Sequence, residues 1–289
     1  MSPQTPSSTI LVPIDFSALS SVAIAHAVNY ALIFKCDLVM IHFVEKGFTD
    51  SDSKIELEKD EAELKLANLA EEVFSLHGIR TSTSVEVDDF KDGIGEAAVK
   101  ANAKFVVMAT KGIHGMQRWT GSNAIKVVLA GKTVPFVVVQ ELPKREIPEN
   151  VILPFSFESE SRQKLGRVPA LAKLFDCVFH IVTEPQSDEF IKNKTEINVN
   201  YAKKYLEEHQ CKYIVSKTAG KKSFHKEVID FADAKQADLI IIMSEEDHDF
   251  TEIFTGSHEQ EIIANEAKIA VMVVNPVDNT LLIGAPMFF

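Results

Sequence analysis

The chain has 289 residues, of which 46% are hydrophobic and 25% are charged, a composition typical of a soluble globular protein rather than a disordered one. Its formal net charge of -12 disfavours nucleic acid and anionic membrane surfaces as general partners. No apolar run approaches the roughly 20 residues that span a bilayer, and the three cysteines have no metal-ligand spacing. We therefore expect a reduced, cytoplasmic protein with no nucleic-acid or membrane partner.

The sequence contains an internal repeat of one unit. The segment "ILVPIDFS" at residues 10–17 recurs as "VILPFSFE" at 151–158, and residues 105–140 align without a gap on 240–275. Order and spacing are preserved, which indicates two homologous domains. We predict a disordered tail at 1–8, a first domain at 9–141, a linker at 142–149, a second domain at 150–276 and an apolar C-terminal tail at 277–289.

Apolar runs alternate with helical periodicity along each unit. In the first unit, strands are predicted at 9–14, 37–44, 80–87, 104–109 and 134–139, and helices at 17–34, 53–77, 91–102 and 121–131. The strands are continuous Val/Ile/Leu runs, as in parallel sheets buried on both faces. We predict an α/β protein of two repeated doubly wound domains, each a five-stranded parallel sheet with helices on both faces. The second unit repeats this order with a shorter second helix near 199–209.

Two loops of the first unit should face the switch point of its sheet, where doubly wound folds bind ligands. One follows strand one and holds Asp15, Phe16 and Ser17; the other spans 109–120 after strand four. The second loop carries glycines and leads into a helix that Gly121-Ser122 opens. Such a helix N-terminus favours phosphate groups.

These segments resemble the universal stress protein family in its tandem two-domain form, through "ILVPIDFS", "VMIHFVE" and "VVMATKG…GSNAIKVV…VPFVVV". The resemblance implies an adenine nucleotide alpha hydrolase-like fold. Nucleotide-binding members carry an Asp that closes strand one and a later Gly-x2-Gly-x9-Gly-Ser/Thr loop, for the nucleoside and the phosphates respectively. Carried over, the implied nucleotide-binding residues are Pro13, Ile14, Asp15, Phe43, Met108, Ala109, Gly112, Gly121, Ser122 and Asn123.

The glycine loop departs from the family pattern in either possible register. Taking Gly112 and Gly115 as the first pair leaves a spacer four residues short, whereas taking Ala109 and Gly112 leaves it one short and agrees with the internal repeat. In the second register alanine replaces a glycine, at a cost of about 1 kcal/mol if the position is left-handed. We therefore expect weak binding. Phe43 either stacks on adenine or fills the space that adenine would occupy.

The second domain departs further. Ser156 stands in the place of Asp15, while Ser244 and Asp247 replace Ala109 and Gly112 within the acidic run "EEDHD" at 245–249. Clustered carboxylates repel a triphosphate unless a metal intervenes. We expect this domain to have lost nucleotide binding.

At several of these positions a structural role would explain the residue as well as a functional one. Asp15 also suits a turn or helix cap, and the serine of Gly121-Ser122 suits an N-cap. His42 reads as a strand-end histidine packed under a helix. The cysteines read as small buried apolar residues, and the Asp247–Asp249 run as a weak divalent-metal candidate.

The expected function is a stress-response binding or regulatory module, not an enzyme. ATP or another adenine nucleotide, with or without Mg²⁺, would bind domain 1 only. A scaffold that binds no nucleotide and a weak ATPase remain as alternatives. The apolar fifth strands at 134–139 and 269–274 would be sheet edges that need a partner, so we expect them to face each other in an intrachain pseudo-dimer, with a homodimer as a further alternative.

Overall fold

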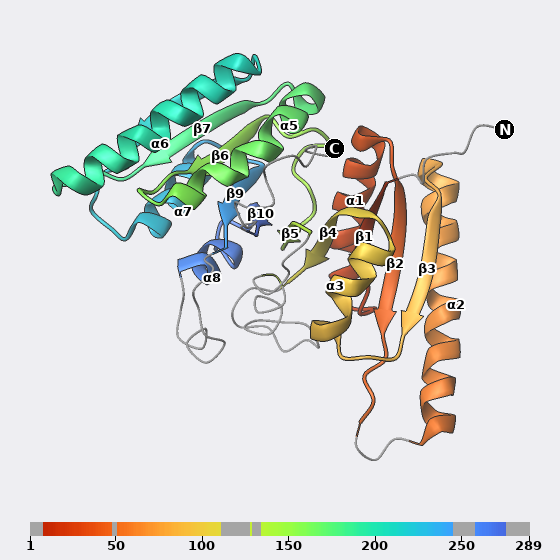
Figure 1. The fold of residues 1–289 in the computed structure, drawn as a ribbon. Helices are drawn as coiled ribbons and strands as arrows, with labels where there is room; N and C mark the ends of the chain where they lie inside the picture. Colours follow the sequence, from red (N-terminus) through yellow and green to blue (C-terminus); the bar gives the residue numbers. More distant parts are fainter. Residues whose placement is uncertain (1–7, 48–50, 111–127, 129–133, 245–257, 276–289) are drawn as a thin grey trace. The chain divides into compact units, whose positions relative to one another are not determined.

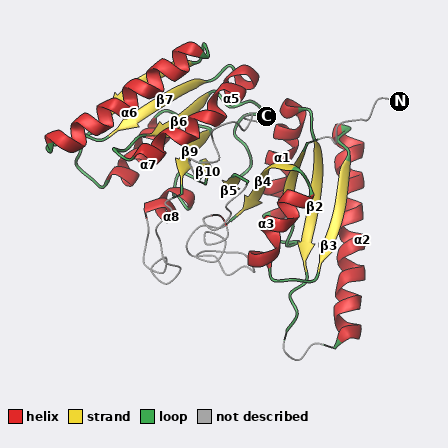
Figure 2. Ribbon diagram, viewed as in Figure 1, coloured by secondary structure: helices red, strands yellow, loops and turns green. Residues whose placement is uncertain are grey.

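The computed structural model describes residues 8–47, 51–110, 128, 134–244 and 258–275. The chain forms two compact units, Met1–Leu142 and Pro143–Phe289. In Figure 1 the first unit runs from red to yellow-green and the second from green to blue. Each unit alternates strands with helices (Figure 2).

The first unit contains a sheet of five parallel strands in the order β3-β2-β1-β4-β5. Because β1 has β2 on one side and β4 on the other, the crossovers leave it in opposite directions, and the sheet is doubly wound as predicted. Of the predicted helix at 121–131, only Val128 lies within the described residues, and it is helical. The elements of this unit are β1 (Thr9–Pro13), α1 (Ser20–Phe34), β2 (Asp37–Phe43), α2 (Asp52–His77), β3 (Thr81–Glu86), α3 (Phe90–Lys100), β4 (Ala103–Ala109) and β5 (Phe136–Val139).

The second unit repeats this topology with strands in the order β10-β9-β6-β7-β8, again all parallel. Here β6 has the place that β1 has in the first unit, between the second and fourth strands of its own sheet. The predicted fold class is therefore confirmed in both halves of the chain. The elements are β6 (Asn150–Pro154), a 3-10 helix η1 (Ser159–Arg167), α5 (Val168–Phe175), β7 (Val178–Thr183), α6 (Glu189–Glu208), β8 (Lys212–Lys217), α7 (Phe224–Ala234), β9 (Leu239–Met243), α8 (His258–Ile263) and β10 (Ala270–Val274).

Helices cover both faces of the first sheet. Neighbouring residues of a strand point to opposite faces, and on β2 they meet different helices. Phe43 packs edge-on against Phe90 of α3 with ring centroids 5.5 Å apart, whereas His42 faces a pocket lined by α2. In the second unit, His180 of β7 lies 6.0 Å from the ring of Phe231 on α7.

One turn recurs where helices end and strands begin. A residue after the helix has a left-handed backbone, which lets its N–H bond to a carbonyl of the last helical turn, as Asp176 does to Ala172 at 3.2 Å. Lys35 and Asp176 follow their helices directly, whereas Asn102, Gln210 and Gln236 are the second residues after theirs and Lys268 lies five residues after α8; all six φ angles are between 50 and 56°. The next residue enters the sheet and is buried in most cases, as at Cys36, Cys177, Cys211, Ala237 and Ile269.

The long helix α2 begins at the capping residue Ser51, whose side chain accepts the N–H of Lys54. Its buried positions recur at helical spacing, at Ile55, Ala62 and Leu66, so it covers the sheet with one face, as its amphipathic pattern predicts. Among the described residues, none of the helices combines the length and the apolar composition needed to cross a membrane.

The second helix of the second unit was predicted too short. It begins at Glu189 rather than near residue 199, because the Asp188 side chain accepts the N–H groups of Phe190 and Ile191 at 2.8 and 3.0 Å. Apolar residues on the solvent side hide its first half from a pattern search: Phe190 is 66% exposed and Ile197 57% exposed. At 20 residues, α6 is still shorter than α2 with 26, as expected.

The first helix of the second unit also differs from its counterpart. Where α1 is one α-helix of 15 residues, the second unit has the 3-10 helix η1 followed by the eight-residue α5. Pro169 lies in the first turn of α5. A proline has no N–H to donate and its ring clashes with the carbonyl four residues earlier, so the α-helix cannot extend further toward the N-terminus.

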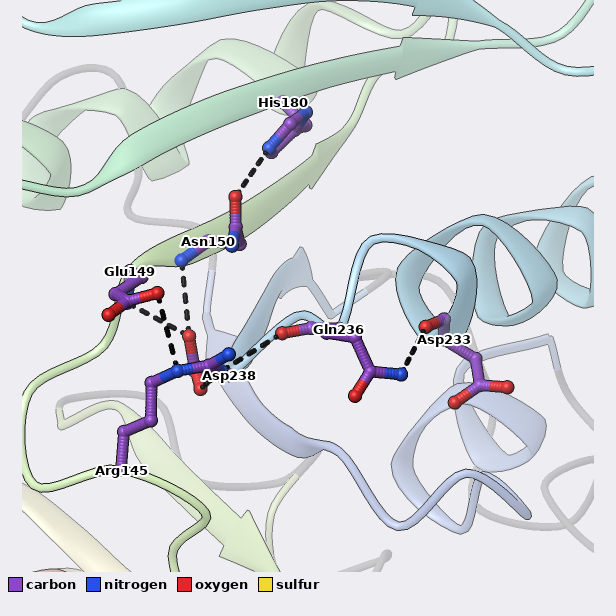
Figure 3. A network of polar contacts seen from close by, with 7 residues as sticks. All are labelled: Arg145, Glu149, Asn150, His180, Asp233, Gln236 and Asp238. Carbon is purple, nitrogen blue, oxygen red and sulfur yellow. Dashed lines mark hydrogen bonds and ion pairs between the residues drawn. The ribbon is translucent and has the colours of Figure 1, made fainter.

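Asp238 fixes the end of the linker to the second unit (Figure 3). Its carboxylate, 8% exposed, accepts Arg145 Nη1 at 2.7 Å and the backbone N–H groups of Glu149 and Asn150 at 2.8 and 3.1 Å. Arg145 Nη1 also donates to the carbonyl of Gln236 at 3.2 Å. One side chain at the start of β9 therefore holds both the linker and the first residue of β6.

We predict that Asp238→Asn lowers the stability of the chain by about 1–3 kcal/mol, measured by urea unfolding. An amide has one acceptor oxygen, so either the guanidinium or the two N–H groups would face an NH₂ donor. Glu208→Gln, which removes an exposed ion pair with Lys204, is the control and should leave the midpoint nearly unchanged. Equal effects of the two substitutions would contradict this role of Asp238.

Candidate functional site

Asp15 lies in the loop that joins β1 to α1, at the carboxyl end of the central strand. Its Oδ1 accepts the N–H of Ser17 and the hydroxyl of Ser20, both at 2.9 Å. Phe16, between Asp15 and Ser17, has a left-handed backbone with φ of 58°. The Asp15 side chain thus closes a tight turn in addition to any ligand contact it makes.

The second unit provides an internal comparison for this turn. Ser156, the counterpart of Asp15, lies 3.3 Å from the hydroxyl of Ser161, and its hydroxyl also lies 3.4 Å from the N–H of Glu158. The same two turn positions are therefore contacted by a neutral side chain. What distinguishes Asp15 from Ser156 is its negative charge and not the turn that it closes.

A pocket of about 330 Å³ opens between this turn, the end of β2 and α2. His42 closes its floor, with Nδ1 2.6 Å from the carbonyl oxygen of Ile14 and its ring 4.7 Å from that of Phe16. Three carboxylates and one ammonium face the pocket, so it suits hydroxyl or amine donors better than phosphate. The polar and aromatic residues that line it are Asp15, Phe16, His42, Glu58, Glu61 and Lys65.

The other predicted residues of the first unit divide into two groups. Pro13, Ile14 and Met108 are buried at the ends of β1 and β4, and Ala109 is half-buried at the last position of β4. Phe43 is 0% exposed, and a side chain at Gly93 would come within 2.5 Å of its ring. In this arrangement the Phe43 ring fills space between β2 and α3. Outside the described residues lie Gly112, Gly121, Ser122 and Asn123, as do His114, Asp247, His248 and Asp249.

In the second unit, Asn198 of α6 fastens the loop after β6. Its Nδ2 donates to the carbonyls of Ser156 and Glu158 at 2.9 and 2.8 Å, and its Oδ1 accepts Arg162 Nε at 2.7 Å. Asn198 is 1% exposed. In the first unit the corresponding loop, after β1, borders the pocket lined by α2, whereas in the second unit Asn198 ties the loop to α6.

Lys164 adds a second internal group at the same end of β6. Its ammonium donates to the carbonyl of Pro154 and lies 4.7 Å from the ring centroid of Phe155. Burial lowers the pKa of Lys164 to about 7. The sequence analysis missed both Lys164 and Asn198. Asn198 could have been found if α6 had been placed correctly, because Thr195, Asn198 and Ala202 share its buried face.

The loop between β8 and α7 forms a ring of backbone donors of the kind that binds anions. The N–H groups of Gly220, Lys221 and Lys222 point at the carboxylate of Glu227 at 2.8, 2.7 and 3.2 Å. The Thr218 side chain and these backbone groups lower the pKa of Glu227 to about 2. The segment "TAGKKS" therefore holds an anion of its own chain.

Ser223, His225 and Glu261 come together between α7 and α8. The hydroxyl of Ser223 lies 3.0 Å from His225 Nε2, and Glu261 Oε2 lies 2.6 Å from the same atom. A nucleophile-activating triad needs the hydroxyl and the carboxylate on opposite ring nitrogens. This cluster therefore lacks the geometry of a proton relay. In the part of the chain that the structure describes, no group of three or more His, Cys, Asp or Glu residues is arranged to hold a metal ion.

Comparison with known proteins finds a family model that matches the first unit and solved structures that share the fold of the chain. Residues 7–140 match the model of the Universal stress protein family. No curated protein sequence matches. Among solved structures, a universal stress protein from Archaeoglobus fulgidus DSM 4304 is 16% identical with a TM-score of 0.73, covering 94% of this chain and 97% of that one. A putative universal stress protein from Pseudomonas aeruginosa UCBPP-PA14 is 12% identical with a TM-score of 0.62, covering 93% and 94%.

A third structure is a universal stress protein from Archaeoglobus fulgidus in complex with dAMP, 19% identical with a TM-score of 0.38, covering 47% of this chain and 100% of that one. The first two likenesses show that the predicted fold, two repeated doubly wound α/β domains, is shared with these proteins over nearly the whole chain. At such identities a structural likeness shows the fold alone, so the chemistry of the site has to be argued from its residues.

We predict that Glu227→Gln lowers stability at neutral pH and that the gap to the unchanged protein closes in acid. The folded-state pKa of about 2 lies below the ordinary value of 4.5, so the ionised carboxylate stabilises the fold above about pH 4.5. That contribution is lost as pH falls toward 2. Urea unfolding at a series of pH values measures it. Asp230→Asn, on the exposed side of the same helix, should show no such gap; a gap independent of pH for Glu227→Gln would contradict the prediction.

Proposed function

We propose that this chain is a tandem universal stress protein: a stress-response binding module whose first unit binds ATP or another adenine nucleotide weakly. The proposal proceeds from the match of residues 7–140 to the family model. It extends to the whole chain through the internal repeat and the shared strand order of the two units.

The observation that carries the nucleotide proposal is the contrast between Asp15 and Ser156. Asp15 lines an open pocket at the carboxyl end of β1, where doubly wound sheets bind their ligands. Ser156 lies in a loop that Asn198 fastens to α6. The same position of the repeat therefore carries a charge beside a pocket in one unit and a neutral side chain in a loop tied to α6 in the other.

The charges of the pocket suggest how a nucleotide would lie. Carboxylates of Asp15, Glu58 and Glu61 accept hydrogen bonds from hydroxyl groups such as those of ribose. The same charges repel phosphates, which would then extend away from α2 toward the segment after β4. We place the nucleoside at Asp15 and the phosphates beyond Ala109, with or without Mg²⁺.

A scaffold that binds no nucleotide is the second candidate, and Phe43 favours it. Its ring is fully buried between β2 and α3, so it offers no face for stacking on a base in this conformation. Ala109 further narrows the approach to the backbone if a glycine is needed there. Both features predict a low affinity of the first unit for nucleotide. Under the scaffold hypothesis, they prevent nucleotide binding altogether.

We predict that isothermal titration of the full chain with ATP gives one weak site and that Asp15→Asn weakens it about ten- to a hundredfold. Loss of a hydrogen bond to a charged group costs about 1.5–3 kcal/mol. Asparagine keeps an acceptor oxygen for Ser17 and Ser20, so the turn should persist. Its melting temperature checks this.

Ser156→Ala is the matched control in the second unit and should leave the titration unchanged. Two sites per chain, or binding insensitive to Asp15→Asn, would contradict the assignment of the site. An absence of binding at millimolar ATP would favour the scaffold.

We predict that the chain does not turn over ATP. The sequence shows neither an evident general base nor a Walker-type lysine for this reaction. Phosphate release by the full chain should equal that of a Gly121→Asp variant, in which a carboxylate repels the phosphates. Release clearly above this control would reveal a weak ATPase.

A further inference from the structure

Two cysteines of the second unit lie side by side at the entrance of neighbouring strands. The parallel ladder of β7 and β8 begins with the pair Val178 and Lys212. Cys177 and Cys211 each come one residue before this pair, so the same register continued by one residue places them opposite each other. Adjacent parallel strands lie about 4.7–4.9 Å apart, which is within the roughly 4.4–6.8 Å between Cα atoms that a disulfide requires.

The two thiols share one face of the sheet and a common burial. Facing residues of a parallel pair point to the same side, and Cys177 is 2% exposed and Cys211 7% exposed. Each follows a left-handed residue, Asp176 or Gln210, whose φ angles of 50 and 56° are nearly the same. Each cysteine therefore enters its strand directly from a left-handed residue.

The first unit has the same architecture without the pair. There Cys36 stands where Cys177 does, after the left-handed Lys35, and it is 5% exposed. The residue opposite it on the next strand is Ile79, because Leu38 pairs with Thr81. Packing at this point thus requires only an apolar neighbour, and the second cysteine is specific to the second unit.

We propose that Cys177 and Cys211 form a peroxide-oxidisable dithiol whose disulfide closes the β7–α6–β8 crossover. A peroxide oxidises one thiol to a sulfenic acid and is itself reduced, with release of one water. The second thiol attacks that sulfur and releases the second water as the S–S bond forms. Two thiols and one peroxide thus give one disulfide and two waters. The inference does not depend on nucleotide binding by the first unit.

The thiols should react slowly in the native protein. Burial raises the pKa of Cys177 to about 12, with smaller rises from Cys211, Asp176 and Asp238. Burial likewise raises the pKa of Cys211, and Lys173 lowers it slightly. Little thiolate exists at neutral pH, and thiolate is the reacting form. Oxidation therefore waits for local opening of the outer strand β8, which suits a response to sustained rather than brief peroxide.

The test is peptide mapping of the full, reduced chain after long exposure to hydrogen peroxide, digested without reductant. The expected product is one linked peptide pair that holds Cys177 and Cys211 and has lost two hydrogens, while Cys36 still reacts with an alkylating agent after unfolding. Oxidation should also raise the urea midpoint reversibly, because the bond restrains the unfolded chain. A reductant should restore the original midpoint.

Cys36→Ala is the matched control, since it removes an equally buried cysteine from the other unit, and it should form the linked pair to the same extent. Cys211→Ala should abolish both the linked pair and the midpoint shift. If that variant does not fold, mapping of the unchanged chain alone decides. Sulfinic acid at either position without a linked pair, or links that join separate chains, would overturn the proposal. So would the absence of any link when oxidation is repeated in urea just below the unfolding midpoint.

Discussion

Parallel pairing of the central strand with a neighbour on each side is the constraint on which the rest of each unit depends. β1 pairs with β2 and β4, and β6 pairs with β7 and β9. Parallel neighbours cannot be joined by a hairpin, so the connections from β1 to β2 and from β6 to β7 cross a face of their sheets through α1 and through η1 and α5. Within each sheet, the loop after the central strand and the loop after its neighbour on the other side of the switch point then lead to opposite faces. The space between these two loops lies at the carboxyl ends of the strands. The topology of the sheet alone therefore places Asp15 and Ser156 at this point, whatever ligand binds there.

The two units show how one frame can carry different chemistry at that point. In the first, a charged turn residue borders a pocket whose floor is His42. In the second, the side chains of Asn198 and Lys164 bond to the carbonyls of the loop and of the strand end. Buried polar groups need partners, and in the second unit the loop after β6 finds them in side chains of its own chain. The divergence therefore concerns a few polar side chains, while the strand order is unchanged.

The strands and most helices could be predicted from the sequence because continuous apolar runs and amphipathic spacing are local signals. The start of α6 could not be predicted, because Phe190 and Ile197 are apolar yet exposed. They obscure the spacing of the residues on the buried face of this helix. The break between η1 and α5 was available in principle from Pro169. The Asn198 contacts and the Glu227 ring depend on groups brought together by tertiary folding, which spacing along one segment does not reveal. Asp15 was predicted from its place after the first strand and from the resemblance, and its contacts with Ser17 and Ser20 match the turn role that the sequence also allowed.

The Asn198 fastening has a consequence for how the two halves respond to their surroundings. A ligand that binds only the folded state stabilises it by mass action, in proportion to the logarithm of its concentration above the dissociation constant. On the proposed function, the resistance of the first unit to unfolding and proteolysis would rise and fall with the adenine nucleotide level of its compartment. The second unit, which under this proposal binds no nucleotide, would not respond to that level. Within one chain, the stability of the first unit would then depend on a metabolite, whereas the stability of the second unit would not.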